Sequence, residues 1–282
     1  MTGQSNNTNT NTGSFNLVDL KPHSIEELTE VITCASFHPK HCNLFGYGTS
    51  KGSVRLGDMR ASALCDRACL CLNGMTSSHQ AATNTFFTEI ISSVSDFQFH
   101  PWEDHLIAAR DYLSVKIYDV RASTSSSSSS SSSNQALGPV HTLPVHDVFL
   151  KQKLCELYEN DCIFDRFKVS WAGTDSLVTG SYGNRVRVLY LNGDHPLNNQ
   201  GQQSTSVEEL RADRSAIVKM GKKVSYSSST TMDMCDTDTN IDSSRKALNV
   251  AVDPNLQTMA IGGTSNLYIF GKTTGSGGTS RM

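Results

Sequence analysis

The chain contains no long apolar run. No segment approaches the ~18 consecutive apolar residues of a membrane-spanning helix, and no charged and apolar leader of the secretory type follows Met1. Its 282 residues carry a formal net charge of −3, so a strongly basic surface for nucleic acid or anionic lipid is not expected. We therefore expect a cytoplasmic protein, with the nucleus as the alternative location, and neither nucleic acid nor membrane among its partners.

Motifs for catalysis and for metal binding are also scarce. The nearest to a metal site is Cys65, Cys69 and Cys71 with His79 further along, which is half of the two tight ligand pairs typical of zinc sites. The 8 cysteines are scattered and several fall in expected strands, which favours buried thiols over a disulfide framework. No nucleophile or phosphate-binding motif has the strand and helix context that it requires. We expect no active site, no metal and no cofactor.

What the chain does have is a repeated pair of β-rich runs. The pairs are residues 33–40 with 52–60, 95–102 with 113–121, 167–174 with 184–191, and 247–254 with 265–272. Apolar residues alternate within the runs and turn residues lie between them, which predicts antiparallel strands. Such repetition, with one run ending in Tyr118-Asp119, is typical of a WD40-type β-propeller. We predict an all-β fold of about four blades.

The irregular spacing of the repeats requires insertions. Residues 123–138 are rich in serine, and 193–246 are mostly polar, so neither segment has enough apolar surface to offset the entropy of ordering it. The same composition marks the ends of the chain. We predict disordered tails at 1–14 and 273–282, and a partial propeller over 15–272 with flexible insertions near 123–138 and 193–246.

One helix is expected among the strands. Ser24 and Glu27 have the spacing of a capping box, and Ile25, Leu28 and Ile32 fall within an arc of about 60° at helical spacing, with Val31 beyond it. The stripe has two interpretations. It packs the helix onto the propeller, or it forms one wall of a groove for a partner peptide.

Several long blocks resemble one protein family. They are FNLVDLKPHSIEELTEVIT (15–33), SKGSVRLGDMRASALCDR (50–67), FFTEIISSVSD (86–96), RDYLSVKIYD (110–119), LCELYENDCIFDRF (154–167) and NLYIF (266–270). Propeller geometry does not dictate most of these residues. In this order they are similar to the C-terminal part of the B-type, 55-kilodalton regulatory subunit of serine/threonine protein phosphatase 2A. The resemblance covers roughly 15–191, with support from 247–272.

The resemblance implies a non-catalytic subunit that selects phosphoprotein substrates. Its partners would be the phosphatase catalytic subunit and a helical-repeat scaffold subunit. The family's substrate-binding positions fall on Ile25, Leu28 and Val31 in the expected helix, and on Asp161 and Arg166 in a segment that mixes charged and aromatic residues. Asp161 has a turn cap as its alternative role, and the family usually has lysine at the place of Arg166.

The chain also departs from the family. The family's propeller has seven blades, and the four expected here would form an open, truncated ring without the hairpin that docks onto the scaffold. An open ring would expose the edges of its strands. The alternative function is therefore a WD40 interaction scaffold that binds no phosphatase, or a truncated copy without function.

Overall fold

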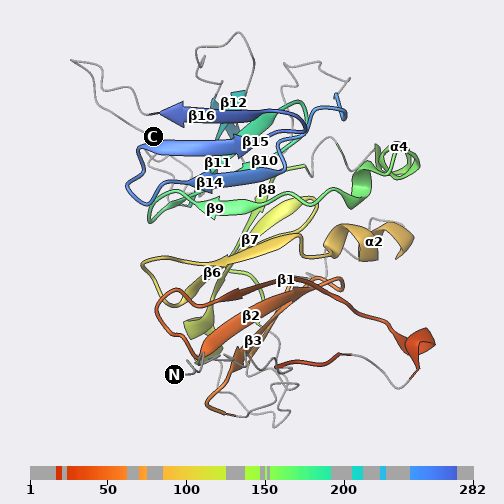
Figure 1. The fold of residues 1–282 in the computed structure, drawn as a ribbon, viewed down its shortest axis with the longest axis vertical. Coiled ribbons are helices and arrows are strands. Elements are labelled where there is room, and N and C mark those ends of the chain that lie inside the picture. Colours follow the sequence, from red (N-terminus) through yellow and green to blue (C-terminus); the bar gives the residue numbers. More distant parts are fainter. Residues whose placement is uncertain are drawn as a thin grey trace, which may run out of the picture.

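Antiparallel sheets dominate the structure, as the alternating apolar pattern predicts. The computed structural model describes residues 17–20, 24–61, 70–74, 85–124, 137–146, 150, 153–191, 205–211, 223–226 and 242–271. Their strands form four separate sheets, which follow one another along the long axis of the molecule (Figure 1). The all-β class and the four blade-like sheets are therefore confirmed. The predicted tails at 1–14 and 273–282 lie outside the described residues.

Each sheet is built from strands in sequence order. The first contains β1 (Ile32–Phe37), β2 (Leu44–Thr49), β3 (Ser53–Asp58) and β4 (Leu70–Asn73). The second contains β5 (Asp96–Phe99), β6 (Leu106–Arg110), β7 (Ser114–Asp119) and β8 (His141–Pro144). The third contains β9 (Val169–Trp171), β10 (Ser176–Gly180), β11 (Arg185–Tyr190), β12 (Thr205–Arg211) and β13 (Lys223–Tyr226). The fourth contains β14 (Asn249–Val252), β15 (Thr258–Gly262) and β16 (Leu267–Gly271).

Apolar side chains join each sheet to the next. The first strands of successive sheets are in contact, β1 with β5, β5 with β9 and β9 with β14. Separate buried clusters surround Phe97 and Tyr118, Trp171 and Leu189, and Val178 and Ile261. Because these apolar faces are removed from water only when the sheets pack together, hydrophobic burial holds the four sheets in one body.

The predicted strands are the first and third of each sheet, and the strand between them was missed. β2, β6, β10 and β15 each contain at least one glycine or alanine, and they lie where the sequence pattern predicted only turn residues. The small residues in these strands allow neighbouring segments to pack closely against them. A Cβ atom on Gly48 would lie 2.6 Å from Cys34 Sγ, and one on Gly180 would lie 1.7 Å from the carbonyl oxygen of Ala247. These glycines therefore let neighbouring backbone and side chains meet.

The second predicted insertion is partly wrong. Residues 193–246 contain β12, which pairs with β11, and β13, which pairs with β12. Val207 is buried beside Trp171 on one face of the sheet, whereas Leu210 packs against the fourth sheet on the other face. These few apolar residues suffice because β11 offers a ready ladder of backbone hydrogen bonds. Of the first insertion, residues 125–136 lie outside the described part, and Leu137 forms a bridge with Leu72.

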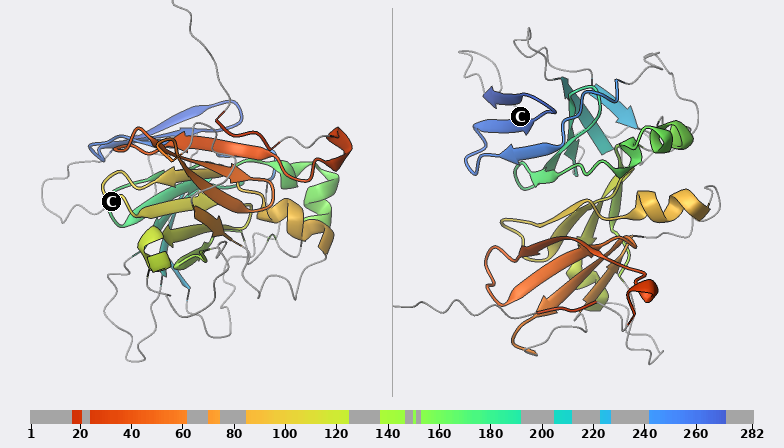
Figure 2. Two further views of the ribbon diagram at one scale, coloured as in Figure 1. Left: turned by 90° about the horizontal axis from the view of Figure 1, so that it is seen from below. Right: turned by 45° about the vertical axis from the view of Figure 1, so that its right-hand side comes forward.

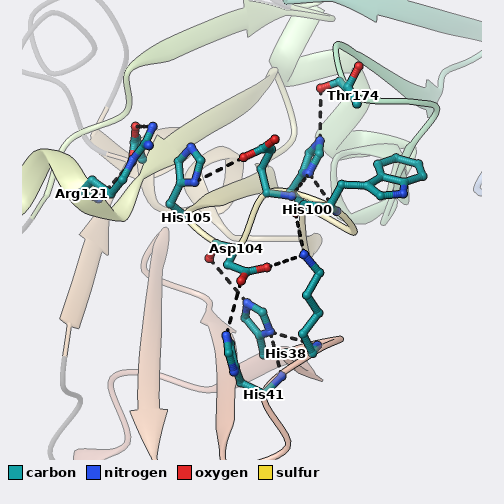
Figure 3. A network of polar contacts seen from close by, with 11 residues as sticks. His38, His41, His100, Asp104, His105, Arg121 and Thr174 are labelled. Carbon is teal, nitrogen blue, oxygen red and sulfur yellow. Dashed lines mark hydrogen bonds and ion pairs between the residues drawn. The ribbon is translucent and has the colours of Figure 1, made fainter.

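Two histidines connect successive sheets in the same way (Figure 3). His38 Nδ1 accepts hydrogen bonds from the backbone N–H groups two and three residues further on, at 3.1 and 3.2 Å, and its Nε2 faces the carbonyl oxygen of Asp104 at 3.5 Å. His100 repeats this geometry, with Nε2 3.1 Å from the carbonyl oxygen of Thr174. Burial lowers the pKa of both imidazoles. Each neutral ring therefore accepts within its own turn and donates to the next sheet.

The helices gather on one side of the molecule. α2 (Thr85–Ser92), α4 (Leu154–Glu159) and the one-turn 3-10 helix η1 (Ile25–Glu27) lie along the same edge in every view (Figures 1 and 2). Two further 3-10 turns are η2 (Val120–Thr124) and η4 (Cys162–Phe164). In the part of the chain that the structure describes, no helix is long and apolar enough to cross a membrane.

The predicted helix around residues 24–32 is wrong except for its first turn. Only Ile25–Glu27 are helical, and β1 already begins at Ile32. The backbone N–H of Ser50 donates to the carbonyl oxygen of Val31 at 2.9 Å, and Ile32 is paired with Thr49. β-Branched residues favour the extended conformation, and pairing with β2 prevails over the local capping signal.

Candidate partner-binding surface

Three exposed aromatic side chains lie on the helical side of the molecule. Phe86 comes from α2, Tyr158 from α4 and Phe164 from η4, and they are 57%, 40% and 53% exposed. The ring centroids of Phe86 and Tyr158 are 5.4 Å apart, and those of Tyr158 and Phe164 are 5.9 Å apart. We call these three residues the aromatic cluster. Exposed aromatic side chains in mutual contact are typical of binding surfaces.

Buried neighbours fix the position of the aromatic cluster. Phe87 and Ile91 lie on the face of α2 that is buried in the core, and Leu154 and Leu157 lie on the buried face of α4. All four pack in one cluster that also contains Tyr182. Because these apolar residues point inward, Phe86 and Tyr158 are left on the outer faces of their helices.

The segment around Leu28 and Val31 presents apolar side chains to solvent. Leu28 is 43% exposed, Val31 and Ile32 are each 45% exposed, and none of the three belongs to a buried cluster of the described residues. The side chain of Ile25 lies outside the described part. The side chains of Leu28, Val31 and Ile32 are therefore accessible to a partner, which favours the groove interpretation over the packing interpretation.

A pocket of about 320 Å³ is lined by Thr29, from this segment, and by Phe164 of the aromatic cluster. Its lining includes Thr29 from the Leu28 segment, Lys51 from the turn between β2 and β3, Glu89 from α2, and Phe164 and Arg166. The tertiary structure thus brings together four separate segments of the sequence. The pocket contains both cationic and anionic side chains, so it is suited to polar or charged groups.

The two charged residues expected from the resemblance occupy different places. We call residues 160–166 the recognition loop. Arg166 lines the pocket, and its guanidinium donates a hydrogen bond to the carbonyl oxygen of Thr33 at 3.2 Å. Asp161 is exposed at the start of η4 and is not among the pocket residues. It is the N-cap residue of η4, its φ of 57° is left-handed and its side chain makes no capping hydrogen bond, so it occupies the position of a turn cap without the side-chain contact.

A buried polar network holds the recognition loop. The Tyr182 hydroxyl lies 2.7 Å from the carbonyl oxygen of Cys162 and 2.8 Å from Asp165 Oδ2, and 2.9 Å from the Tyr112 hydroxyl. Lys246 Nζ lies 2.8 and 2.7 Å from the two carboxylate oxygens of Asp165. Burial raises the pKa of Tyr182 well above its usual range, so the hydroxyl stays protonated and available as a donor.

Sequence reasoning missed the aromatic cluster and Lys246 as parts of this surface. The three aromatic residues stand in the blocks that resemble the family, but the sequence pattern predicts neither α2 nor α4. An apolar stripe in TFFTEIIS, with Phe87 and Ile91 four residues apart, was the available signal for α2. Nothing in the sequence around Lys246 connects it with Asp165.

One group of potential metal ligands occurs among the described residues. Atoms of His38, His41 and Asp104 lie within 4.8 Å of one another. Both ring nitrogens of His38 are already engaged, and Lys40 Nζ holds Asp104 Oδ1 at 2.8 Å (Figure 3). A metal would have to displace these contacts, so the group does not fit a metal site. Of the cysteine motif, Cys65, Cys69 and His79 lie outside the described part.

Comparison with known proteins identifies relatives over most of the chain. No family model matches it. Over 258 residues, 91% of the chain, it is 43% identical to the B beta isoform of the serine/threonine-protein phosphatase 2A 55 kDa regulatory subunit from Carassius auratus. It is 40% identical over the same length to the B gamma isoform from Oryctolagus cuniculus. The chain spans about half, 52%, of the length of these curated relatives.

Proposed function

The chain is a homologue of the 55 kDa regulatory B subunits of protein phosphatase 2A over 91% of its length, and from this premise we propose that it is a regulatory, non-catalytic component of that phosphatase. In this role the chemistry of dephosphorylation belongs to a separate catalytic subunit, held with this chain on a helical-repeat scaffold. The chain itself supplies a surface that captures phosphoprotein substrates.

The observation that supports substrate capture is the grouping of exposed apolar and aromatic residues beside a charged pocket. The exposed Leu28 directly precedes Thr29, which lines the pocket, and Phe164 of the aromatic cluster lines it as well. Aromatic anchors and a few charged groups around a concavity are the usual elements of peptide recognition. A partner segment with apolar side chains and a charged group would contact both parts at once.

Reconstitution tests the assignment to the phosphatase. We expect the purified chain to hydrolyse no phosphopeptide alone, and to co-elute with the scaffold and catalytic subunits in size-exclusion chromatography. The complex should dephosphorylate chosen phosphoproteins faster than the catalytic and scaffold subunits without the chain. A stable chain that never co-elutes with them would favour the alternative of an interaction scaffold without a phosphatase.

Substitution of the aromatic cluster tests the surface. Phe86→Ala should weaken capture of a phosphoprotein substrate, because truncation of an exposed aromatic anchor removes contact area without opening the core. Trp102→Ala is the matched control, since Trp102 is 43% exposed and lies in the turn between β5 and β6, at the other end of the strands from α2. Equal loss of capture in both variants would contradict this site.

The location in the cell is a separate proposal. We propose that the chain acts in the cytoplasm, with the nucleus as the alternative. Imaging of the tagged chain in fixed cells, with compartment markers, distinguishes the two.

A further inference from the structure

The charge of the pocket depends on a residue outside it. Four charged side chains line the pocket, namely Lys51, Glu89, Asp165 and Arg166. Within the described residues, Lys51, Glu89 and Arg166 make no ion pair, whereas both carboxylate oxygens of Asp165 contact Lys246 Nζ. The pair is mostly buried, with 22% and 14% of the two side chains exposed.

The pairing leaves the pocket with a surplus of positive charge. Because Lys246 neutralises Asp165, two cations face one carboxylate, that of Glu89. If Lys246 were neutral, Asp165 would be an uncompensated carboxylate and the surplus would disappear. Because the pair is mostly buried, removal of Lys246 would leave the Asp165 carboxylate buried without a partner, which destabilises the protein more than the loss of an exposed pair. Solvent therefore does not screen out the effect of Lys246 on the charge of the pocket.

The same ion pair anchors the recognition loop to the last sheet. Lys246 forms a bridge with Tyr182, in the turn between β10 and β11, and its backbone N–H lies 3.4 Å from Thr264 Oγ1, in the turn between β15 and β16. Asp165 directly precedes Arg166, so the position of the carboxylate restrains the backbone that carries the pocket's guanidinium. Lys246 therefore acts on the pocket by charge and by position, although it lies 81 residues from Asp165 in the sequence.

We propose that Lys246 is a specificity-determining residue of the partner-binding surface, which makes the pocket select a segment with an acidic side chain over one with a basic side chain. This inference rests on the proposed function of the surface. Arg166 and Lys51 would contact the acidic group, and the apolar side chains of the same segment would contact Leu28 and the aromatic cluster.

A charge series of peptides tests the proposal on the full chain. The probes are three fluorescein-labelled amphipathic peptides with Leu and Phe at helical spacing, identical except for Glu, Gln or Lys beside the apolar face. Binding is measured by fluorescence anisotropy at two salt concentrations. The wild-type chain should prefer the Glu peptide over the Lys peptide, and Lys246→Met should reduce this preference by roughly two- to fivefold.

Two further variants separate charge from general damage. The double variant Asp165→Asn with Lys246→Met removes both charges and should restore the preference for the Glu peptide. Lys40→Met is the matched control, because it removes an ion pair with Asp104 in a turn at the opposite ends of the strands, and should leave the preference unchanged.

The outcomes distinguish this inference from the proposed function. If Lys246→Met weakens all three peptides equally, or if the double variant fails to restore the preference, Lys246 does not set specificity. If the preference is unchanged in Lys246→Met while Leu28→Asp still abolishes binding, the inference fails and the surface stands. If the wild-type chain binds none of the peptides, both are overturned.

Discussion

The substitution Leu28→Asp separates a binding role from a packing role for the apolar segment before β1. Complete burial of a leucine contributes ~1.5 to 3 kcal/mol. Leu28 is 43% exposed and belongs to no buried cluster of the described residues, so we expect the free energy of unfolding to fall by no more than about 1 to 1.5 kcal/mol. At about 2 to 4 °C per kcal/mol for a domain of this size, the melting temperature should fall by less than about 6 °C.

Binding should respond much more strongly. A carboxylate at this position replaces an apolar contact and must be desolvated when a partner covers it. We expect the affinity for a captured phosphoprotein or peptide to fall at least about tenfold, which corresponds to ~1.4 kcal/mol. Differential scanning fluorimetry and anisotropy titration, on the same samples, measure both quantities.

Two control variants set the scale of these measurements. Leu267→Asp changes a leucine that is 70% exposed on the outermost strand of the fourth sheet, and should affect neither property. Leu72→Asp places a charge where the leucine is 0% exposed and should cost more than about 4 kcal/mol. The reasoning is refuted if Leu28→Asp lowers the melting temperature as much as Leu72→Asp, with binding lost only in proportion to unfolding.

Three further predictions concern charge, packing and pH. Arg166→Glu should reduce the affinity for the Glu peptide by at least about fivefold with little change in melting temperature, as measured by anisotropy and fluorimetry. Gly180→Ala should lower the free energy of unfolding, measured by urea titration, by about 2 kcal/mol or more, because the added Cβ would clash with the Ala247 carbonyl oxygen. Gly138→Ala is the control and should be neutral, because a Cβ there would meet no atom within 4 Å. Burial and two nearby guanidinium groups hold the pKa of His146 well below 6.5. The unfolded chain therefore binds more protons, so stability present at neutral pH should be lost as the pH falls below about 6.5, and a melting temperature that stays constant to pH 5 would contradict this.

Local patterns were sufficient to predict the class of the fold and its repetition. The first and third strands of every sheet alternate apolar and polar residues or form apolar runs, and both patterns reflect burial of a pleated face. The middle strands could not be recognised in the same way. Gly48 has no room for a larger side chain because Cys34 and Val94 lie against it, and Gly180 has none because Ala247 does; only the packed structure contains these neighbours.

The segment before β1 marks the limit of local signals. Ser24 and Glu27 favour a helix start, yet the helix ends after one turn because Val31 and Ile32 find hydrogen-bond partners near β2. Propensity is a weak preference that tertiary pairing overrides. Leu28 and Val31 are exposed, as the groove interpretation requires, although the helical conformation predicted for them was wrong.

The sequence by itself therefore determined the first and third strands of each sheet, and it carried the blocks that connect the chain with its relatives. The tertiary structure alone decided which distant side chains meet. Phe86, Tyr158 and Phe164 form one cluster, and Lys246 reaches Asp165 across 81 residues. The physical reason is that periodicity records only whether a residue faces the core, whereas the partner of a side chain depends on how the sheets and helices pack.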